Sequence, residues 1–219
     1  MFIGHFGLSF AAKKLAPKVS LGTLFIATQF VDLLWPFLLI FNIEKVAIVP
    51  GYTETNAFEF LFYPYTHSLL MNLVWGIVVG LIYWFIKRDK RGSVIVGLCV
   101  FSHWFLDVIV HVADLPLTPF SDYKVGLGLW NHLAATLVIE TTLFLIGTAI
   151  YITCTKAKNK IGKWGLWVLV VLLLAVNFGN AFGPTPSNSL MSLFVSSVIA
   201  SVLIISLSYW VDKNREVKG

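Results

Sequence analysis

Six long apolar runs divide the chain, and each has about the 20 residues that a helix needs to cross a hydrocarbon core. They occupy residues 21–42, 67–86, 93–112, 132–152, 164–183 and 189–210. A further apolar stretch, from Phe2 to Ala12, is too short to span a membrane and too apolar for water, so we predict a half-membrane helix there. The pattern predicts an all-α, polytopic membrane bundle of six transmembrane helices plus this short N-terminal helix.

Composition supports one membrane domain over residues 1–219. Hydrophobic residues make up 58% of the chain and charged residues 12%, far below the roughly 25% charged residues of soluble domains. The net charge of +5 does not indicate a nucleic-acid partner, because the basic residues form short clusters between the apolar runs. Cys99 and Cys154 lie far apart without CxxC spacing, so neither a disulfide framework nor a thiolate zinc site is expected.

The basic residues also predict the topology. Of the 16 Lys and Arg residues, 14 lie near the two chain ends or in every second connection between the apolar runs. Only Lys45 and Lys124 lie in the other connections. By the positive-inside rule this predicts a multi-pass protein of the bacterial inner (plasma) membrane with both termini in the cytoplasm. The connections 43–66 and 113–131 are then expected to face outward, and the aromatic segment 58–65 to lie at the headgroup level.

Several titratable side chains lie in or beside apolar runs, where an ionisable group is costly unless it faces the bundle interior and finds a partner. They are His5, Asp32, His67, His103, Asp107, His111, His132 and Glu140. Three of them, His103, Asp107 and His111, follow one another at fourfold spacing, which places them on one helix face. At about 1.5 Å per residue, Asp32, His103 and Asp107 lie roughly 15–21 Å from the cytoplasmic helix ends. We therefore expect residues distant in sequence to meet near the middle of the membrane.

Imidazoles and carboxylates without a competing thiolate suit a divalent metal ion, zinc first and manganese as the alternative. Water bound to such an ion becomes nucleophilic near neutral pH, which suits hydrolysis. A spare carboxylate, Asp32 or Glu140, could then take the proton. Glu140 could equally be a buried carboxyl that stays protonated, and either interpretation fits its position in the run.

Short motifs over roughly residues 1–150 resemble a known family. These are Gly4-His5, the buried Asp32, Tyr65-Thr66-His67-Ser68, and Ser102-His103 followed by Asp107. They are similar to the bacterial membrane-bound metal-dependent hydrolases, also described as LexA-binding, inner-membrane-associated hydrolases of the YdjM type. The resemblance implies metal ligands at His5, Asp32, His67, His103 and Asp107.

Two differences from the family pattern are visible in this chain. Asp32 stands alone, with Gln29 before it and Pro36 after it, where the family has a Pro-Asp-x-Asp run. The family's Arg before Thr-His-Ser is replaced by Tyr63-Pro64-Tyr65. The single aspartate favours one metal ion over two.

We predict that the remaining polar residues support the site or the helix packing without binding the metal. We expect Thr66, His111 and His132 to lie behind the ligands rather than to bind the metal. Helices over about 164–210 are expected to be accessory, with polar side chains that hydrogen-bond between helices: Asn177, Asn180, Ser196 and Ser197.

The resulting hypothesis is a metal-dependent membrane hydrolase that cleaves an ester or phosphoester of a membrane lipid or similar amphipathic substrate. Two other classes stay open. A proton- or metal-coupled transporter would need polar groups that continue to both membrane faces. A non-catalytic membrane scaffold would use the buried charges only to fix helix packing. The sequence does not specify the oligomeric state.

Overall fold

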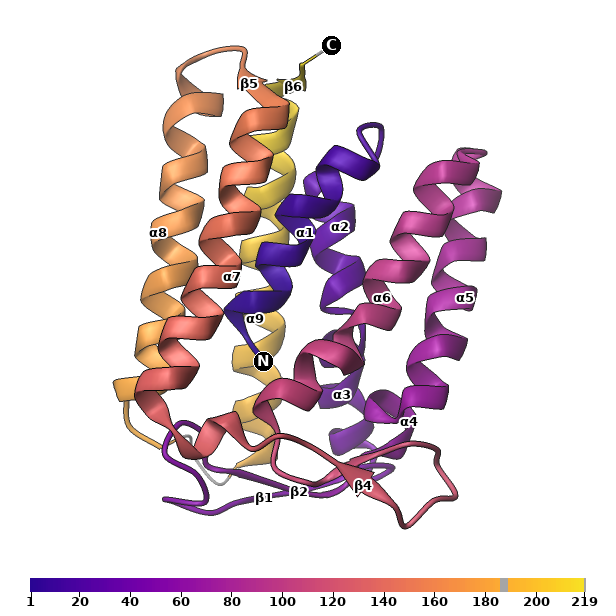
Figure 1. Ribbon diagram of the computed structural model, residues 1–219, viewed down its shortest axis with the longest axis vertical. Coiled ribbons are helices and arrows are strands. Elements are labelled where there is room, and N and C mark those ends of the chain that lie inside the picture. The colour runs from indigo at the N-terminus through magenta and orange to yellow at the C-terminus, as the bar shows by residue number, and fades with distance from the viewer. Residues whose placement is uncertain (186–188, 219) are drawn as a thin grey trace.

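The computed structural model describes residues 1–185 and 189–218 and is a bundle of long helices (Figure 1). Five helices are long and apolar enough to cross a membrane. They are α5 (Leu69–Lys87), α6 (Lys90–Val110), α7 (Leu133–Cys154), α8 (Lys160–Phe182) and α9 (Leu190–Lys213). These helices confirm the membrane bundle, and each lies within a few residues of the predicted run.

The predicted span over 21–42 is not one continuous helix. It consists of α2 (Leu21–Thr28) and α3 (Phe30–Ile40), which are bent by 53° relative to each other. Gln29 separates them, and Pro36 lies inside α3. Proline lacks an amide hydrogen and weakens the helical ladder one turn before it. The first of the six predicted spans is therefore a bent pair of helices rather than one straight helix.

The N-terminal helix α1 (Ile3–Leu15) runs beside α7 and is shorter than the spanning helices, as predicted. The two helices approach closely at Gly7, where an added Cβ would lie 2.7 Å from the backbone oxygen of Leu143. At the far end of α1, Lys13 Nζ lies 2.8 Å from Asp212 Oδ2 on α9. Figure 1 shows that α1 starts at mid-height in the bundle, and Met1 is buried there. Met1 thus lies in the interior, at the inner end of the predicted half-membrane helix.

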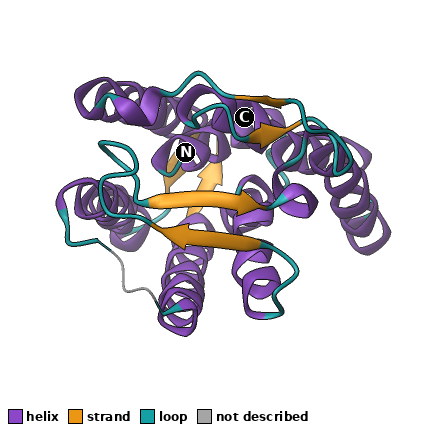
Figure 2. Cartoon of the chain, turned by 90° about the horizontal axis from the view of Figure 1, so that it is seen from below, coloured by secondary structure: helices purple, strands orange, loops and turns teal. Residues whose placement is uncertain are grey.

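Short strands close one end of the bundle, below the helices in Figure 1 and facing the viewer in Figure 2. Strands β1 (Lys45–Ile48) and β2 (Phe58–Phe62) form an antiparallel hairpin. The second connection contributes β3 (Leu115–Pro116), β4 (Lys124–Val125) and the 3-10 helix η1 (Leu129–Asn131). The short helix α4 (Pro64–His67) leads from β2 into α5. The two predicted outward loops are therefore folded into a cap over this end of the bundle.

The opposite end is closed by apolar packing and by a second small sheet. Strands β5 (Thr155–Ala157) and β6 (Arg215–Val217) pair beside the C-terminus. Between the two ends, fully buried side chains of α1, α2 and α7, namely Phe10, Phe25 and Phe144, form part of one hydrophobic core. This core fills the half of the bundle that lies between α1 and the β5–β6 end.

Candidate metal centre

Three polar residues of α6 face the bundle interior at the capped end of the helix. His103 and Asp107 are 1% exposed, and His111 directly follows the last residue of α6 and is 2% exposed. Their fourfold spacing places them on one face, as the sequence predicted. The cluster of titratable groups is built around this face.

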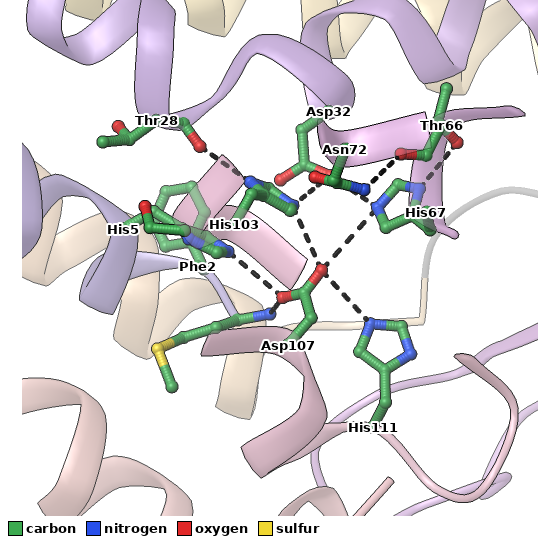
Figure 3. Close-up of polar contacts among 12 residues, drawn as sticks. Phe2, His5, Thr28, Asp32, Thr66, His67, Asn72, His103, Asp107 and His111 are labelled. Carbon is green, nitrogen blue, oxygen red and sulfur yellow. Dashed lines mark hydrogen bonds and ion pairs between the residues drawn. The ribbon is translucent and has the colours of Figure 1, made fainter. Parts of the chain in front are cut away.

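The two carboxylate oxygens of Asp107 face different partners (Figure 3). Oδ1 accepts from His5 Nε2 at 3.1 Å and from the amino group of Met1 at 2.5 Å. Oδ2 lies 3.1 Å from His103 Nε2 and 3.8 Å from the Nε2 atoms of His67 and His111. Asp107 is therefore the centre on which α1, α4 and α6 converge.

Asp32 brings the second carboxylate from α3. Its Oδ1 atom lies 3.2 Å from His67 Nε2 and 3.5 Å from His103 Nε2. The Asp32 side chain is 39% exposed, whereas the side chain of Asp107 is only 2% exposed. Asp32 thus forms the accessible edge of the cluster, next to a cavity.

Hydrogen bonds on the far side of each ring fix which nitrogen faces the carboxylates. His103 Nδ1 lies 2.7 Å from the carbonyl oxygen of Thr28, which only accepts, so His103 carries its proton on Nδ1. His67 Nδ1 lies 2.6 Å from Thr66 Oγ1, and that hydroxyl is 2.7 Å from Glu44 Oε2. When Glu44 is ionised, Thr66 donates to it and accepts from His67 Nδ1, so that Nε2 of His67 faces Asp32 Oδ1 at 3.2 Å.

His111 follows the same rule. Its Nδ1 atom lies 3.0 Å from Asp114 Oδ1, which also accepts a 2.8 Å hydrogen bond from the hydroxyl of Tyr63. Burial raises the pKa of Tyr63 well above its usual value, and the charge of Asp114 raises it further, so this hydroxyl keeps its proton. The Nε2 atom of His111 is consequently directed towards Asp107, which makes it a closer neighbour of the cluster than we predicted.

The donor set fits a divalent metal ion. Nε2 of His103 is buried and has no hydrogen-bond partner among the described residues, although it lies between two carboxylates. Unprotonated ring nitrogens and carboxylate oxygens repel one another unless a cation lies between them. Imidazole nitrogen and carboxylate oxygen are ligands expected for zinc. A histidine that binds a metal typically donates its other ring N–H to an oxygen acceptor, as His103 does to Thr28.

Two triads have atoms close enough together to share an ion. One consists of Asp32, His67 and His103, and the other of His5, His103 and Asp107. In the second triad the His5 ring stacks on the His103 ring, with centroids 3.8 Å apart and an angle of 6° between the planes. All five residues expected to bind metal are thus brought together.

Glu140 and His132 lie elsewhere. Glu140 is buried, and its Oε2 atom accepts backbone N–H groups of Phe2 and Ile3 at 2.9 Å and of Gly4 at 3.5 Å. It therefore caps the start of α1, whose first N–H groups would otherwise be unpaired. His132 is exposed at the start of α7 and is not part of the cluster or of the cavity lining.

Several supporting residues were not predicted from the sequence. Glu44 and Asp114 come from the connections that were expected to face water, yet both are buried. Burial raises the pKa of Glu44. Neither residue lies in an apolar run or in a motif, so only the fold of the cap places them behind the histidines.

A cavity of about 690 Å³ borders the cluster and extends towards α8 and α9. Asp32, His67, Asp107 and His111 line one part of it. The four polar residues expected to join helices also line it: Asn177, Asn180, Ser196 and Ser197. Asn177 Nδ2 has no hydrogen-bond partner among the described residues, and the Ser196 hydroxyl donates to a carbonyl oxygen of its own helix. Among the described residues, the interhelical hydrogen bonds predicted for Asn177 and Ser196 are therefore not formed, and α8 and α9 help to enclose the candidate site.

The aromatic cap lies directly over the histidines. Phe60 of β2 and Trp130 of η1 contact the His111 ring, with centroids 5.0 Å and 4.2 Å away. Tyr63 lies 5.2 Å from the His67 ring. The cap therefore supplies an apolar cover that separates this side of the cluster from the aqueous phase.

Comparison with known proteins identifies the family. The profile of the family described as YdjM inner membrane protein matches residues 55–181, which include His67, His103 and Asp107 and all of α8 but its last residue. No curated protein and no solved structure was found to match the chain. The match covers more than half of the chain, and its family description agrees with the apolar helices in indicating a multi-pass membrane protein. The chain belongs to the YdjM inner membrane protein family.

Proposed function

We propose that this protein is a metal-dependent hydrolase that acts on an ester or phosphoester of a membrane lipid. The observation that carries the proposal is the convergence of the Nε2 atoms of His67 and His103 on Oδ1 of Asp32 and Oδ2 of Asp107. Oxygen atoms that bind the opposite ring nitrogens hold both imidazoles in this orientation. A cluster used only for helix packing does not need a buried ring nitrogen without a hydrogen-bond partner, such as Nε2 of His103 among the described residues.

The proposed ligands are His67, His103, Asp32 and Asp107, with His5 at the second oxygen of Asp107. A divalent metal ion bound there, zinc first and manganese as the alternative, would act as a Lewis acid and make a water molecule nucleophilic near neutral pH. Asp32 borders the cavity and is the carboxylate best placed to accept a proton from that side. The buried Asp107 holds the imidazoles in place.

The cavity supports an amphipathic substrate. Its lining combines apolar side chains such as Leu33 and Ile204 with the amides and hydroxyls of α8 and α9. Pockets of several hundred Å³ with a few polar groups are typical of small-molecule sites. The described lining contains no Lys or Arg side chain, so no basic side chain would neutralise a phosphate group there. This favours an uncharged ester within the proposed substrate class.

Elemental analysis of the detergent-purified protein is the direct test, with wild type beside His103→Ala and Asp107→Ala. We expect near-stoichiometric transition metal in wild type and loss from both variants, with helical content unchanged by circular dichroism. Hydrolysis of carboxyl-ester and phosphoester lipids is then assayed with the same samples. Equal metal content in all three proteins would remove the proposal.

The transporter alternative is less well supported. Between the cluster and the β5–β6 end, the interior is mostly apolar, with fully buried side chains such as Leu24 and Phe25. The buried polar groups there are paired within the protein, Ser9 with Thr28 and Lys13 with Asp212. A pathway for ions needs polar groups on both sides of the central site. Uptake of zinc into vesicles that contain the protein, with no hydrolysis of any lipid, would support this alternative instead.

A further inference from the structure

A second pocket lies beside strands β5 and β6. These strands are at the end of the bundle opposite the cap (Figure 1). The pocket has a volume of about 270 Å³ and is formed by the end of α7, the β5 and β6 strands and the first turns of α8. It is separate from the cavity at the metal cluster, because the two have no lining residue in common. By the positive-inside rule, this end is the predicted cytoplasmic side.

The lining of this pocket is strongly basic. Four of its side chains are cationic, namely Lys156, Lys163, Arg215 and Lys218, and none of its lining residues is acidic. The cavity at the metal cluster has the opposite character, with carboxylates and no basic side chain among its described lining residues. The positive charge of the second pocket therefore favours an anionic ligand.

Arg215 supplies a fixed positive charge at the wall. It is only 8% exposed and donates to Thr155 Oγ1 at 3.0 Å and to the carbonyl oxygen of Gly162 at 2.7 Å. These acceptors are neutral, and Arg215 forms no ion pair with a carboxylate within residues 1–185 and 189–218. A buried charge without a counter-ion favours binding of an anion close by.

The lysines around it are available for the same ligand. Lys218 Nζ donates to the carbonyl oxygen of Ile152 at 3.3 Å, and Lys163 Nζ lies 5.1 Å from the centre of the Trp164 ring. Both contacts leave the ammonium charge uncompensated. Lys156 pairs with Glu216, but that pair is largely exposed and is expected to be weak.

Apolar side chains complete the pocket and point to a lipid rather than a free ion. Ile152, Leu166 and Trp167 lie beside the basic groups, and Trp167 is 47% exposed at the start of α8. Tryptophan is enriched where helices leave the hydrocarbon core for the headgroup region. A ligand that contacts both the basic and the apolar side chains needs an anionic group attached to an apolar chain.

We propose that this pocket binds the phosphate headgroup of an anionic phospholipid from the adjacent leaflet, with the lipid's apolar part against Trp167 and Leu166. Basic pockets between helix ends are suited to anionic headgroups, since phosphate oxygens accept strong hydrogen bonds from Lys and Arg. The pocket is separate from the metal cluster, so this proposal does not depend on the reaction proposed for that cluster.

Lipid titration of the full-length protein in detergent, followed by native mass spectrometry, tests the proposal. Phosphatidylglycerol is compared with phosphatidylcholine, and the double variant K163Q/K218Q with wild type. Each lysine near a headgroup is expected to contribute roughly fivefold to affinity, so the double variant should bind phosphatidylglycerol roughly 25-fold more weakly. Wild type should retain phosphatidylglycerol at concentrations where phosphatidylcholine dissociates.

Two matched variants separate the pocket from general charge effects. K87Q/K90Q removes the same charge from the exposed α5–α6 connection and should bind as wild type does. K163R/K218R keeps the charge and should also bind. Equal weakening in K87Q/K90Q and K163Q/K218Q, or failure of the charge-retaining variant to bind, would overturn the proposal. Displacement of the lipid by millimolar inorganic phosphate would instead assign the pocket to soluble anions and overturn the lipid assignment.

Discussion

The Nε2 atom of His103 lies 3.1 Å from Oδ2 of Asp107, one helical turn further along α6, and forms no hydrogen bond in the described structure. The opposite nitrogen of the same ring is held by the carbonyl oxygen of Thr28. A neutral histidine fixed in this way presents a lone pair to a carboxylate, an arrangement that needs either a metal ion between the two groups or a second proton on the ring.

Removal of the metal should lower the stability of the wild-type protein. A ligand present at 100 times its dissociation constant stabilises the folded state by about 2.7 kcal/mol, so chelation should reverse a gain of that order. We expect a clear fall in the midpoint of thermal unfolding in detergent after chelator treatment and its recovery with zinc. His103→Ala should show no response, whereas His132→Ala, whose side chain is exposed outside the cluster, should respond as wild type does. A chelator response in His103→Ala would contradict the assigned ligand set.

Thr66→Val should weaken metal binding without removing a ligand. The variant loses the hydroxyl that lies between His67 Nδ1 and Glu44. Loss of such supporting hydrogen bonds typically costs about 10–100-fold in metal affinity. Competition with a zinc-binding dye measures the change, and Thr66→Ser should restore most of the affinity because it keeps the hydroxyl. Equal affinities in the valine and serine variants would show that the hydroxyl is not needed.

Glu140→Ala should destabilise the fold. The substitution leaves buried N–H groups of Phe2 and Ile3 without an acceptor, and each such group costs about 1–3 kcal/mol. Glu140→Gln keeps a carbonyl oxygen as an acceptor and should lose less. Chemical denaturation in detergent measures both variants. If Glu140→Gln kept its stability and its metal but lost hydrolysis, Glu140 would act in proton transfer as well as in capping.

The burial of Glu44 predicts a pH dependence of stability. Because burial raises the pKa of Glu44 above its usual value of 4.5, the folded state favours the protonated form. This contribution to stability is fully present below about pH 4.5 and is lost as the pH rises through the raised pKa of the folded state. The unfolding midpoint of wild type relative to Glu44→Gln should therefore fall as the pH rises from 4 to 8. A relative midpoint that rises over this interval would mean that the pKa of Glu44 is lowered on folding.

The orientation of the bundle is a separate prediction. A reporter fused after residue 218 should be active in the cytoplasm, because the basic clusters flank that end of the helices. The same reporter inserted at residue 121, in the connection between β3 and β4, should be active on the outside. The reverse pattern would invert the predicted topology and place the second pocket in the outer leaflet.

Periodicity and length were sufficient to predict the long helices and the face of α6. The fourfold spacing of His103, Asp107 and His111 determines their common direction on any straight helix, and depth along the membrane then predicted their meeting with Asp32. These features depend on local geometry, which the sequence contains directly.

The supporting groups depend on contacts between distant segments and were not predictable in the same way. Glu44 and Asp114 are buried only because the cap folds back over the bundle, and nothing in their own segments indicates burial. The break at Gln29 was missed because apolar character alone does not distinguish a straight span from a bent one. The lining role of α8 was missed because its amide side chains also suit ordinary contacts between helices.

The bend between α2 and α3 leaves a backbone carbonyl oxygen at the end of α2 available to a histidine of α6. In an unbroken helix the carbonyl oxygen of Thr28 would accept the amide hydrogen of the residue four positions later. Here it accepts a hydrogen bond from the imidazole of His103, 75 positions away in sequence. If this segment became straight, the carbonyl oxygen of Thr28 would no longer be available to the His103 ring, which could then rotate. A change of backbone shape at Gln29 would therefore alter the orientation of His103.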